Sequence, residues 1–302
     1  MQPSSFPVWL DIEPQFPHSA SQVEPSIIDC PVGTIPVLRN SRSGTIEAPN
    51  IYGVSSTGVE REAAGIEYRD DVYGATVTIN VWEPKVNKDS KDFSATWVQI
   101  NNGAGEHTDR IGAGLIVNPS LSGDTFVRFH IAWTNGLEKK ACIDQSCLGF
   151  VQVNRKWSPG ARMPHVSIYD GPQWETKVNI FKDLKTKNWW VTYGKNMPIG
   201  YWPSSLFTFL HDKGNFAFWG GIVQGPTATS KAPQMGSGHF ASEGFRKAAA
   251  IRNIQIVNEN YTYVTPEDDL RLAHGTSNPT LYTVDKFRDD TPGMRIYYGG
   301  PG

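Results

Sequence analysis

Strict alternation of apolar and polar residues, beginning just after Tyr73, is the strongest structural signal in this chain. At positions 75–81 Ala, Val, Ile and Val alternate with Thr, Thr and Asn, and at 127–133 Val, Phe, Ile and Trp alternate with Arg, His and Ala. A period of two places successive side chains on opposite faces of a β-strand. Further strands are expected at 96–101, 148–153, 176–182, 188–193, 216–223 and 249–257.

Turn-forming clusters separate these runs. Asn101-Asn102-Gly103 and Asp212-Lys213-Gly214 are typical of tight turns. The one short helix we expect begins near Pro203-Ser204-Ser205, where Ser caps a helix and Pro opens it. Many strands and almost no helix predict an all-β fold, an antiparallel β-sandwich.

Residues 1–66 have a different character. Short extended pieces at 7–12 and 34–38 stand among Pro, Ser, Asn and Gly, and a stretch rich in Ser, Gly and Thr follows at 41–58. We therefore expect an N-terminal segment over 1–66 and a folded domain over 67–302. A poorly ordered extension is the simpler interpretation of the first part.

Composition narrows the class of function. Lys and Arg number 28 against 30 Asp and Glu, for a net charge of −2, with no long run of either sign. Nucleic-acid and anionic-membrane binders need a basic stripe, so neither class is expected. No apolar run approaches the roughly 20 residues of a membrane span. The first 30 residues also lack the basic start and apolar stretch of a signal peptide.

Cysteine and histidine residues give no metal site. The 7 His show no ligand spacing of the His-x-x-x-His kind, so we expect no metal and no cofactor. Of the three cysteines, Cys142 and Cys147 lie five positions apart, a spacing that by itself fits a disulfide and a chance pair of reduced thiols equally. Cys30 is then left as a free thiol.

Several uncommon motifs occur in a fixed order. Two of them read Ile-Gly-Ala-Gly-Leu at 111–115 and Trp-Gly-Gly-Ile-Val at 219–223. With the blocks named below, the chain resembles the neprosin family, plant glutamic endopeptidases that cleave after proline. The other matching blocks are 73–82, 142–152, 188–190, 199–207, 234–245 and the closing Tyr-Tyr-Gly-Gly-Pro-Gly at 297–302.

The resemblance carries expectations beyond the residues themselves. It implies a lectin-like, jelly-roll type β-sandwich whose concave face holds the cleft, a disulfide between Cys142 and Cys147, and a secreted or apoplastic protein. It also implies that residues 1–66 are the back part of a propeptide that covers the cleft until it is removed. If the chain enters the secretory route, Asn260 in Asn-Tyr-Thr is its glycosylation site.

Both catalytic glutamates of the family are replaced in this chain. The family writes the two main motifs roughly as Ile-Glu-Ala-Gly-Trp and Trp-Gly-Gly-Glu-Val, and the glutamate positions here hold Gly112 and Ile222. A peptidase of this class needs one carboxyl to take a proton from water and another to give one to the leaving nitrogen. Neither Gly nor Ile carries a proton, so no catalytic residue of the family is retained.

Other acids are weaker candidates. Asp109 lies three positions before Gly112, so on a strand it faces the opposite side, and we expect it and Glu106 to be solvated loop acids. Asp124 fits a turn. Glu243, inside a matching block, is expected to be structural but is the best outside candidate for a lone catalytic carboxylate.

Three further positions are expected to line the cleft: Trp97, Gln99 and Trp219. Where the family has Ser-Gln-Ile-Trp, this chain has Thr-Trp-Val-Gln at 96–99, so an aromatic and an amide exchange places on one strand face. This exchange favours a reshaped ligand surface. His130 and His239 are expected to be structural, with ligand contact as the alternative.

The sequence thus predicts a catalytically impaired relative of a peptidase, a monomer whose cleft binds a Pro-containing peptide or a glycan. Two alternatives stay open. One is an active acid-pH post-proline endopeptidase with relocated acid and base, using Glu243 and a second acid. The other is a carbohydrate-binding module, because 10 Trp on a sandwich scaffold suit sugar stacking as well as a core.

Overall fold

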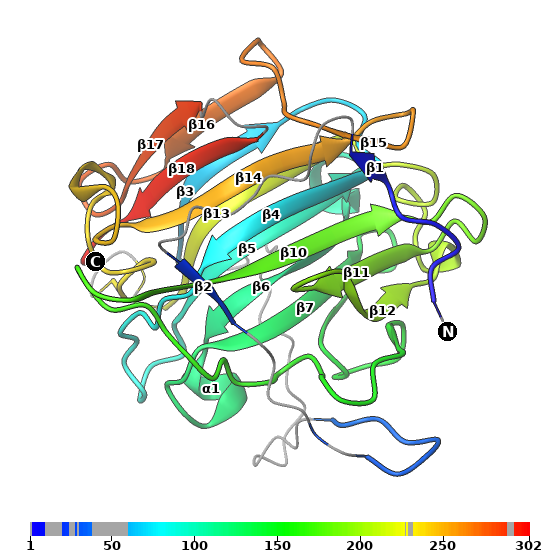
Figure 1. Cartoon of the computed structure of the whole chain (residues 1–302), viewed down its shortest axis with the longest axis horizontal. Helices are drawn as coiled ribbons and strands as arrows, with labels where there is room; N and C mark the ends of the chain where they lie inside the picture. Colours follow the sequence, from blue (N-terminus) through cyan, green and yellow to red (C-terminus); the bar gives the residue numbers. More distant parts are fainter. Residues whose placement is uncertain are drawn as a thin grey trace.

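Two β-sheets stacked face to face form the protein, as the computed structural model shows (Figure 1). The all-β sandwich expected from the alternating pattern is confirmed. The structure describes residues 2–9, 20–23, 28, 30–37, 60–226, 228, 232–288 and 293–302.

The larger sheet, sheet A, runs in the order β1-β15-β14-β4-β10-β11-β12-β9, with β18 and β17 continuing from β14 and β2 paired to β10. Apart from β1 and β2, which pair in parallel, its strands are antiparallel. The strands are β1 (Val8–Trp9), β2 (Ala20–Gln22), β4 (Gly74–Asn80), β9 (Val151–Gln152), β10 (Gln173–Lys182), β11 (Trp189–Tyr193), β12 (Met197–Trp202), β14 (Ala249–Val257), β15 (Thr262–Val264), β17 (Thr283–Arg288) and β18 (Met294–Gly299).

The smaller sheet, sheet B, is antiparallel throughout and runs in the order β16-β3-β13-β5-β6-β7-β8. Its central strands pair over nearly their whole length without a register shift. The strands are β3 (Glu60–Tyr68), β5 (Phe93–Asn102), β6 (Asp109–Val117), β7 (Arg128–Asn135), β8 (Lys140–Ile143), β13 (Phe216–Gly225) and β16 (Leu272–Thr276).

The main core lies between the sheets. The apolar residues of each alternating run point inward, so Val77 of β4 and Ile131 of β7 belong to one buried cluster. The polar residues of the same runs point outward but are also buried in several places, as with Thr76 and His130. Sheet B therefore has an inner face on the core and a separate outer face.

Helical structure is confined to short turns. The turn expected near Pro203 is present as a 3-10 helix, η2 (Ser204–Leu206), without a side-chain cap. A one-turn helix, α1 (Pro119–Ser122), was not expected, although Asn118 caps it through a hydrogen bond from the backbone N–H of Leu121. The remaining two are 3-10 helices, η1 (Gly105–His107) and η3 (Ala241–Glu243).

The described N-terminal residues pack on sheet A. Val8 and Trp9 pair with β15, residues 20–22 pair with β10, and the Phe6 ring lies 5.3 Å from that of Phe181. A domain boundary between residues 66 and 67 would pass through β3, which pairs with both β13 and β16. Residues 60–66 are thus an integral part of sheet B, and the propeptide role of the preceding residues stays a prediction.

Candidate functional site

Gly112 and Ile222 lie on the outer face of sheet B, on the two strands that flank β5. Gly112 of β6 is opposite Gln99, and Ile222 of β13 is opposite Ala95. Trp97 comes from the same face of β5, between these two levels. Strand β5 therefore lies between Gly112 and Ile222, and their levels differ by four residues along it. The indole of Trp97 lies between the two.

Apolar side chains fill this part of the outer face. Trp97 and Ile222 have no exposed surface and belong to one cluster with Phe218 and others. Glycines make room for the rings: a Cβ on Gly114 would lie 2.9 Å from Cε3 of Trp97, and one on Gly220 would lie 2.7 Å from Cζ of Phe218. The remaining members of the cluster are Phe93, Ala95, Ile116, Leu121, Ala132 and Ile143.

No carboxylate replaces the missing pair on the strands that carry it. The outward residues of β5, β6 and β13, all within the described chain, are apolar, glycine, amide or arginine. On the neighbouring strand β3 the acid in register on this face is Glu67, which is half-exposed and paired with Arg69 at 2.6 Å. The outward residues of β5, β6 and β13 therefore include no carboxyl group of the kind the chemistry needs.

Of the three expected cleft-lining residues, the structure brings two together. Gln99 and Trp97 share the outer face, and Gln99 is buried with its Nε2 donating to Asn101 at 2.8 Å while its Oε1 accepts no hydrogen bond. Trp219 instead points inward and packs in the main core, because it is an odd number of residues from Ile222. It does not line the outer face.

His130 reaches the same face from β7, opposite Gly114. Its Nδ1 lies 2.6 Å from Oδ2 of Asp144, whose other oxygen accepts the backbone N–H of Ile131 at 3.0 Å. A carboxylate only accepts hydrogen bonds, so Nδ1 carries a proton. This buried Nε2 has no hydrogen-bond partner. The histidine is held structurally, as expected, with one polar atom unmatched.

Asp109 was expected to be a solvated loop acid, and this expectation was wrong. It does face away from Gly112, but it is fully buried at the start of β6. Its carboxylate accepts backbone N–H groups of Gly136, Phe209 and Leu210, at 3.0, 2.5 and 3.2 Å. By contrast Glu106 is exposed, as expected.

Glu243 lies away from the outer face of sheet B, in η3, which contacts β17 and β18. Its carboxylate accepts the hydroxyl of Tyr169 and bonds Nδ1 of His239, both at 2.9 Å. Burial acts to raise the pKa of Glu243, but the hydrogen bonds from Tyr169 and His239 outweigh it and hold that pKa below its usual value. A proton donor needs the opposite shift, so this environment favours a structural role.

The covalent framework follows the expectation from the family. Cys142 and Cys147 form a disulfide, and Cys30 is free and half-buried. Asn260 is exposed in the turn between β14 and β15. Over the described ranges, no group of three His, Cys, Asp or Glu side chains is placed to hold a metal ion, and no helix there is long and apolar enough to cross a membrane.

Comparison with known proteins places the chain in a peptidase family. The sequence profile of the Neprosin family matches residues 90–301, so the chain belongs to the Neprosin family. Among solved structures, it is similar to Scytalido-glutamic peptidase with a peptide-based transition-state analog, at 11% identity and a TM-score of 0.41, covering 80% of this chain and 98% of that one. It is also similar to SCP-B, a member of the Eqolisin family of peptidases in a complex with the tripeptide Ala-Ile-His, at 11% identity and a TM-score of 0.35, with the same coverage.

Two largely buried side chains, Asp144 and Lys182, were not predicted from the sequence. Asp144 has no signal in the sequence beyond its place between the two cysteines. Lys182 ends β10 with its amine buried among backbone carbonyl groups, and only its position at the end of an alternating run, where an apolar residue is expected, hinted at this.

Proposed function

We propose that this protein is a catalytically impaired member of the peptidase family, whose sheet B outer face binds a Pro-containing peptide without cleaving it. The observation that carries the first part is the burial of Ile222 within an apolar cluster around Trp97, at a position where the family holds a glutamate. An apolar site without a carboxyl group supplies neither the general base nor the general acid that the reaction needs.

A peptide ligand is supported by the polar atoms left over on this face. Oε1 of Gln99 and Nε2 of His130 are both buried and have no hydrogen-bond partner. Buried polar groups are costly when unpaired, so a ligand that offers polar groups between apolar contacts gains from both. Phe216, which is only partly buried at the edge of the cluster, gives the flat apolar contact that a proline ring needs.

The test of impaired catalysis is a peptidase assay on the purified full chain. We expect no products above a buffer control when Pro-rich peptides are incubated between pH 2 and pH 7. Cleavage after proline that survives repeated purification, and that is unchanged when Gln99 is replaced, would overturn the proposal and favour relocated acids such as Glu243.

The test of binding is a titration of the intrinsic Trp fluorescence with a Pro-rich peptide and, separately, with a panel of glycans. We expect the peptide to bind and Gln99→Leu, which removes the acceptor at similar volume, to weaken it by about tenfold, the cost of one unpaired group of about 1.4 kcal/mol. Saturable binding of a glycan but not of the peptide would favour the carbohydrate-binding alternative.

A secreted life belongs to the same proposal. The disulfide and the family membership are compatible with an extracellular protein. Asn260 is exposed and free of steric cover, so we expect a glycan there in a sample expressed through the secretory route. An unmodified Asn260 in such a sample would count against this part.

A further inference from the structure

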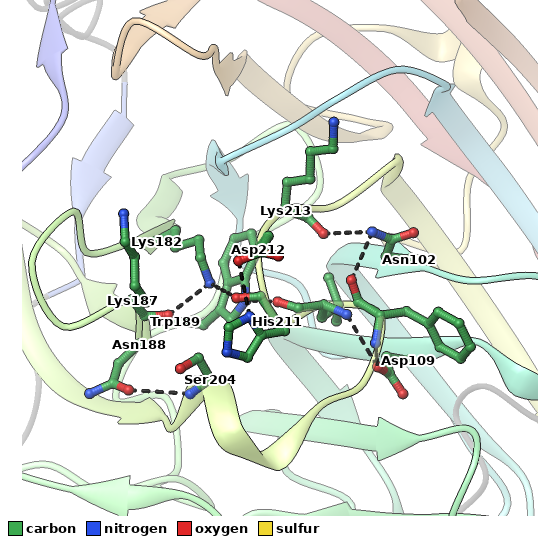
Figure 2. Close-up of polar contacts among 12 residues, drawn as sticks. Asn102, Asp109, Lys182, Lys187, Asn188, Trp189, Ser204, His211, Asp212 and Lys213 are labelled. Atoms are coloured by element: carbon green, nitrogen blue, oxygen red, sulfur yellow. Dashed lines mark hydrogen bonds and ion pairs between the residues drawn. The ribbon is translucent and has the colours of Figure 1, made fainter.

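Lys182 is a buried amine at the end of the sandwich, outside the two motifs that hold Gly112 and Ile222. It is the last residue of β10 and is only 4% exposed. Its side chain points to the end of the core, where Nζ lies 4.9 Å from the centre of the Trp189 ring (Figure 2). No step proposed for the outer face of sheet B uses this group.

The hydrogen bonds of Lys182 suit a neutral amine. Nζ donates to the backbone oxygen of Lys187 at 2.7 Å and to that of His211 at 2.5 Å, and no carboxylate in the described ranges lies within ion-pair distance. A neutral amine has two N–H groups and one lone pair, so two carbonyls satisfy its donors completely. An ammonium group would have a third N–H with no oxygen acceptor, directed at the Trp189 ring.

A cavity of about 300 Å³ adjoins this amine. Leu184 and Asn258 contribute to its wall together with charged and phenolic side chains, and Lys182 itself is part of the lining. The titratable groups that face the amine across this cavity are Tyr73, Asp183, Lys187, Asp212, Glu259 and Tyr261.

The surroundings also favour the uncharged form. Burial lowers the pKa of Lys182 to about 8, with Asp212 acting to raise it and Lys187 acting to lower it further. An ordinary lysine titrates near 10.4, so at neutral pH roughly two hundredfold more of this amine is unprotonated. Burial raises the pKa of Tyr261 to about 12, so that phenol stays neutral in the same range.

We propose that Lys182 is a nucleophilic amine that forms an imine with small, uncharged hydroxyaldehydes entering this cavity. Carboxylates of Asp212 and Glu259 can accept hydrogen bonds from hydroxyl groups, and together with Asp183 they repel anionic aldehydes. The cavity of about 300 Å³ has room for such a molecule. The assignment is independent of the function proposed for sheet B.

The reaction balances without a further reactant. The nitrogen lone pair attacks the carbonyl carbon, and a proton passes from nitrogen to oxygen to give a carbinolamine. Loss of its hydroxyl group as water then forms the C=N bond, so one aldehyde and one amine give one imine and one water. Reduction by added cyanoborohydride converts the imine into a stable secondary amine for detection.

The experiment maps the modified lysine in the full chain. Glycolaldehyde and cyanoborohydride are added at pH 7, and peptides are quantified by mass spectrometry over time. We expect Lys182 to be modified at least about tenfold faster than Lys185, an exposed lysine of the same turn. Glyoxylate, which is anionic, should react at Lys182 more slowly than glycolaldehyde does.

Two neighbours give matched controls for the pH profile. Asp212→Asn removes a charge that favours the ammonium form, so the rate profile of Lys182 should shift to lower pH. Lys187→Asn removes a like charge and keeps its backbone carbonyl, so the profile should shift to higher pH. Asn tolerates the positive φ of 58–61° seen at such turn positions in this chain.

Labelling of Lys182 no faster than that of Lys185 would overturn the proposal, as would a pH profile that neither substitution moves. Equal rates for glyoxylate and glycolaldehyde would reject the assigned ligand class. Mapping on the unmodified chain decides the first point even if a variant fails to fold.

Discussion

The outer face of sheet B and the end of the sandwich around Lys182 differ in whether they contain buried charged side chains. At the outer face Gly112 and Ile222 stand where the resemblance predicts the family glutamates, and Trp97, Phe218 and Ile222 form a buried apolar cluster. At the end of the sandwich two charged groups, Asp109 and Lys182, stay buried and bind backbone groups of residues 207–213 (Figure 2).

The difference shows at which positions a buried charged residue can be replaced by an apolar one without loss of the fold. A catalytic carboxylate is held for its chemistry, and apolar packing fills its place at little cost to folding. Asp109 and Lys182 instead satisfy N–H and C=O groups of a segment that links β12 in sheet A to β13 in sheet B, and no apolar residue does that. The first region could lose its charges without losing its fold, and the second could not.

The strongest test of this comparison introduces carboxyl groups at positions 112 and 222 of the outer face. We expect Gly112→Glu with Ile222→Glu to recover some acid-pH cleavage after proline, because each acid or base role is commonly worth about 10²–10⁴ in rate. Each single change should do far less, since one carboxyl cannot serve both proton transfers. Buried among apolar groups, one of the two carboxyls should have a raised pKa, and folding at neutral pH should weaken.

The measurement is a peptidase assay between pH 2 and pH 6 on a double variant shown to be folded by circular dichroism. Trp97→Gln in the same background is the companion variant, because the indole stands between the two levels. A folded but inactive triple variant would show that the surface around the acid pair has diverged too, and would move our preference toward the non-peptidase alternatives.

The charged end is tested at Asp109. Asp109→Ala leaves three buried backbone N–H groups without their acceptor, so the free energy of unfolding should fall by about 3–6 kcal/mol. Glu106→Ala, which removes an exposed acid three residues earlier, should change it by less than about 0.5 kcal/mol. Denaturant unfolding of both variants gives the comparison, and similar losses for the two would contradict the role assigned to Asp109.

These two acids also show what the sequence reveals and what it conceals. The alternating runs located the long strands β4, β5, β7, β10, β11, β13 and β14, because burial on one face leaves a period of two. The alternating pattern did not predict β3, because its Glu60 and Glu62 suggest solvent exposure. In the structure Glu62 is buried and bonds Ser277 and Asn278. Its partners lie more than 200 residues away, and no local pattern records them.

The site was predictable in part for the same reason. The resemblance predicted that Gly112, Ile222 and Trp97 lie around one cleft, and the period-two rule put Trp97 and Gln99 on one strand face. The same rule applied to Trp219, three residues before Ile222, would have assigned it to the core. The burial of Asp109 and Lys182 depends on backbone groups of a distant segment, so composition and spacing carried no signal for it.

The apolar nature of the outer cluster gives the next prediction. Ile222→Ala should lower the free energy of unfolding by about 3 kcal/mol, because it leaves a cavity beside Trp97, whereas Ile222→Val should cost only about 1 kcal/mol. The graded pair distinguishes packing from an effect of local backbone change. Small and equal decreases in the free energy of unfolding for both variants would show that this face is loosely packed, contrary to the buried apolar cluster described above.

The pH dependence of the free energy of unfolding tests the environment of Lys182. A lysine in the unfolded chain titrates near 10.4, whereas burial lowers the pKa of Lys182 to about 8 in the folded protein. Between these values the unfolded state binds a proton that the folded state does not, so this group makes stability rise with pH across that window. Below about pH 8 its contribution is a constant penalty. We expect the free energy of unfolding of the wild type to gain about 1–3 kcal/mol relative to Lys182→Met between pH 7.5 and pH 10.5. Parallel pH curves for the two proteins would show that Lys182 keeps an ordinary pKa, and that the end of the sandwich holds a fully charged ammonium group instead of a neutral amine.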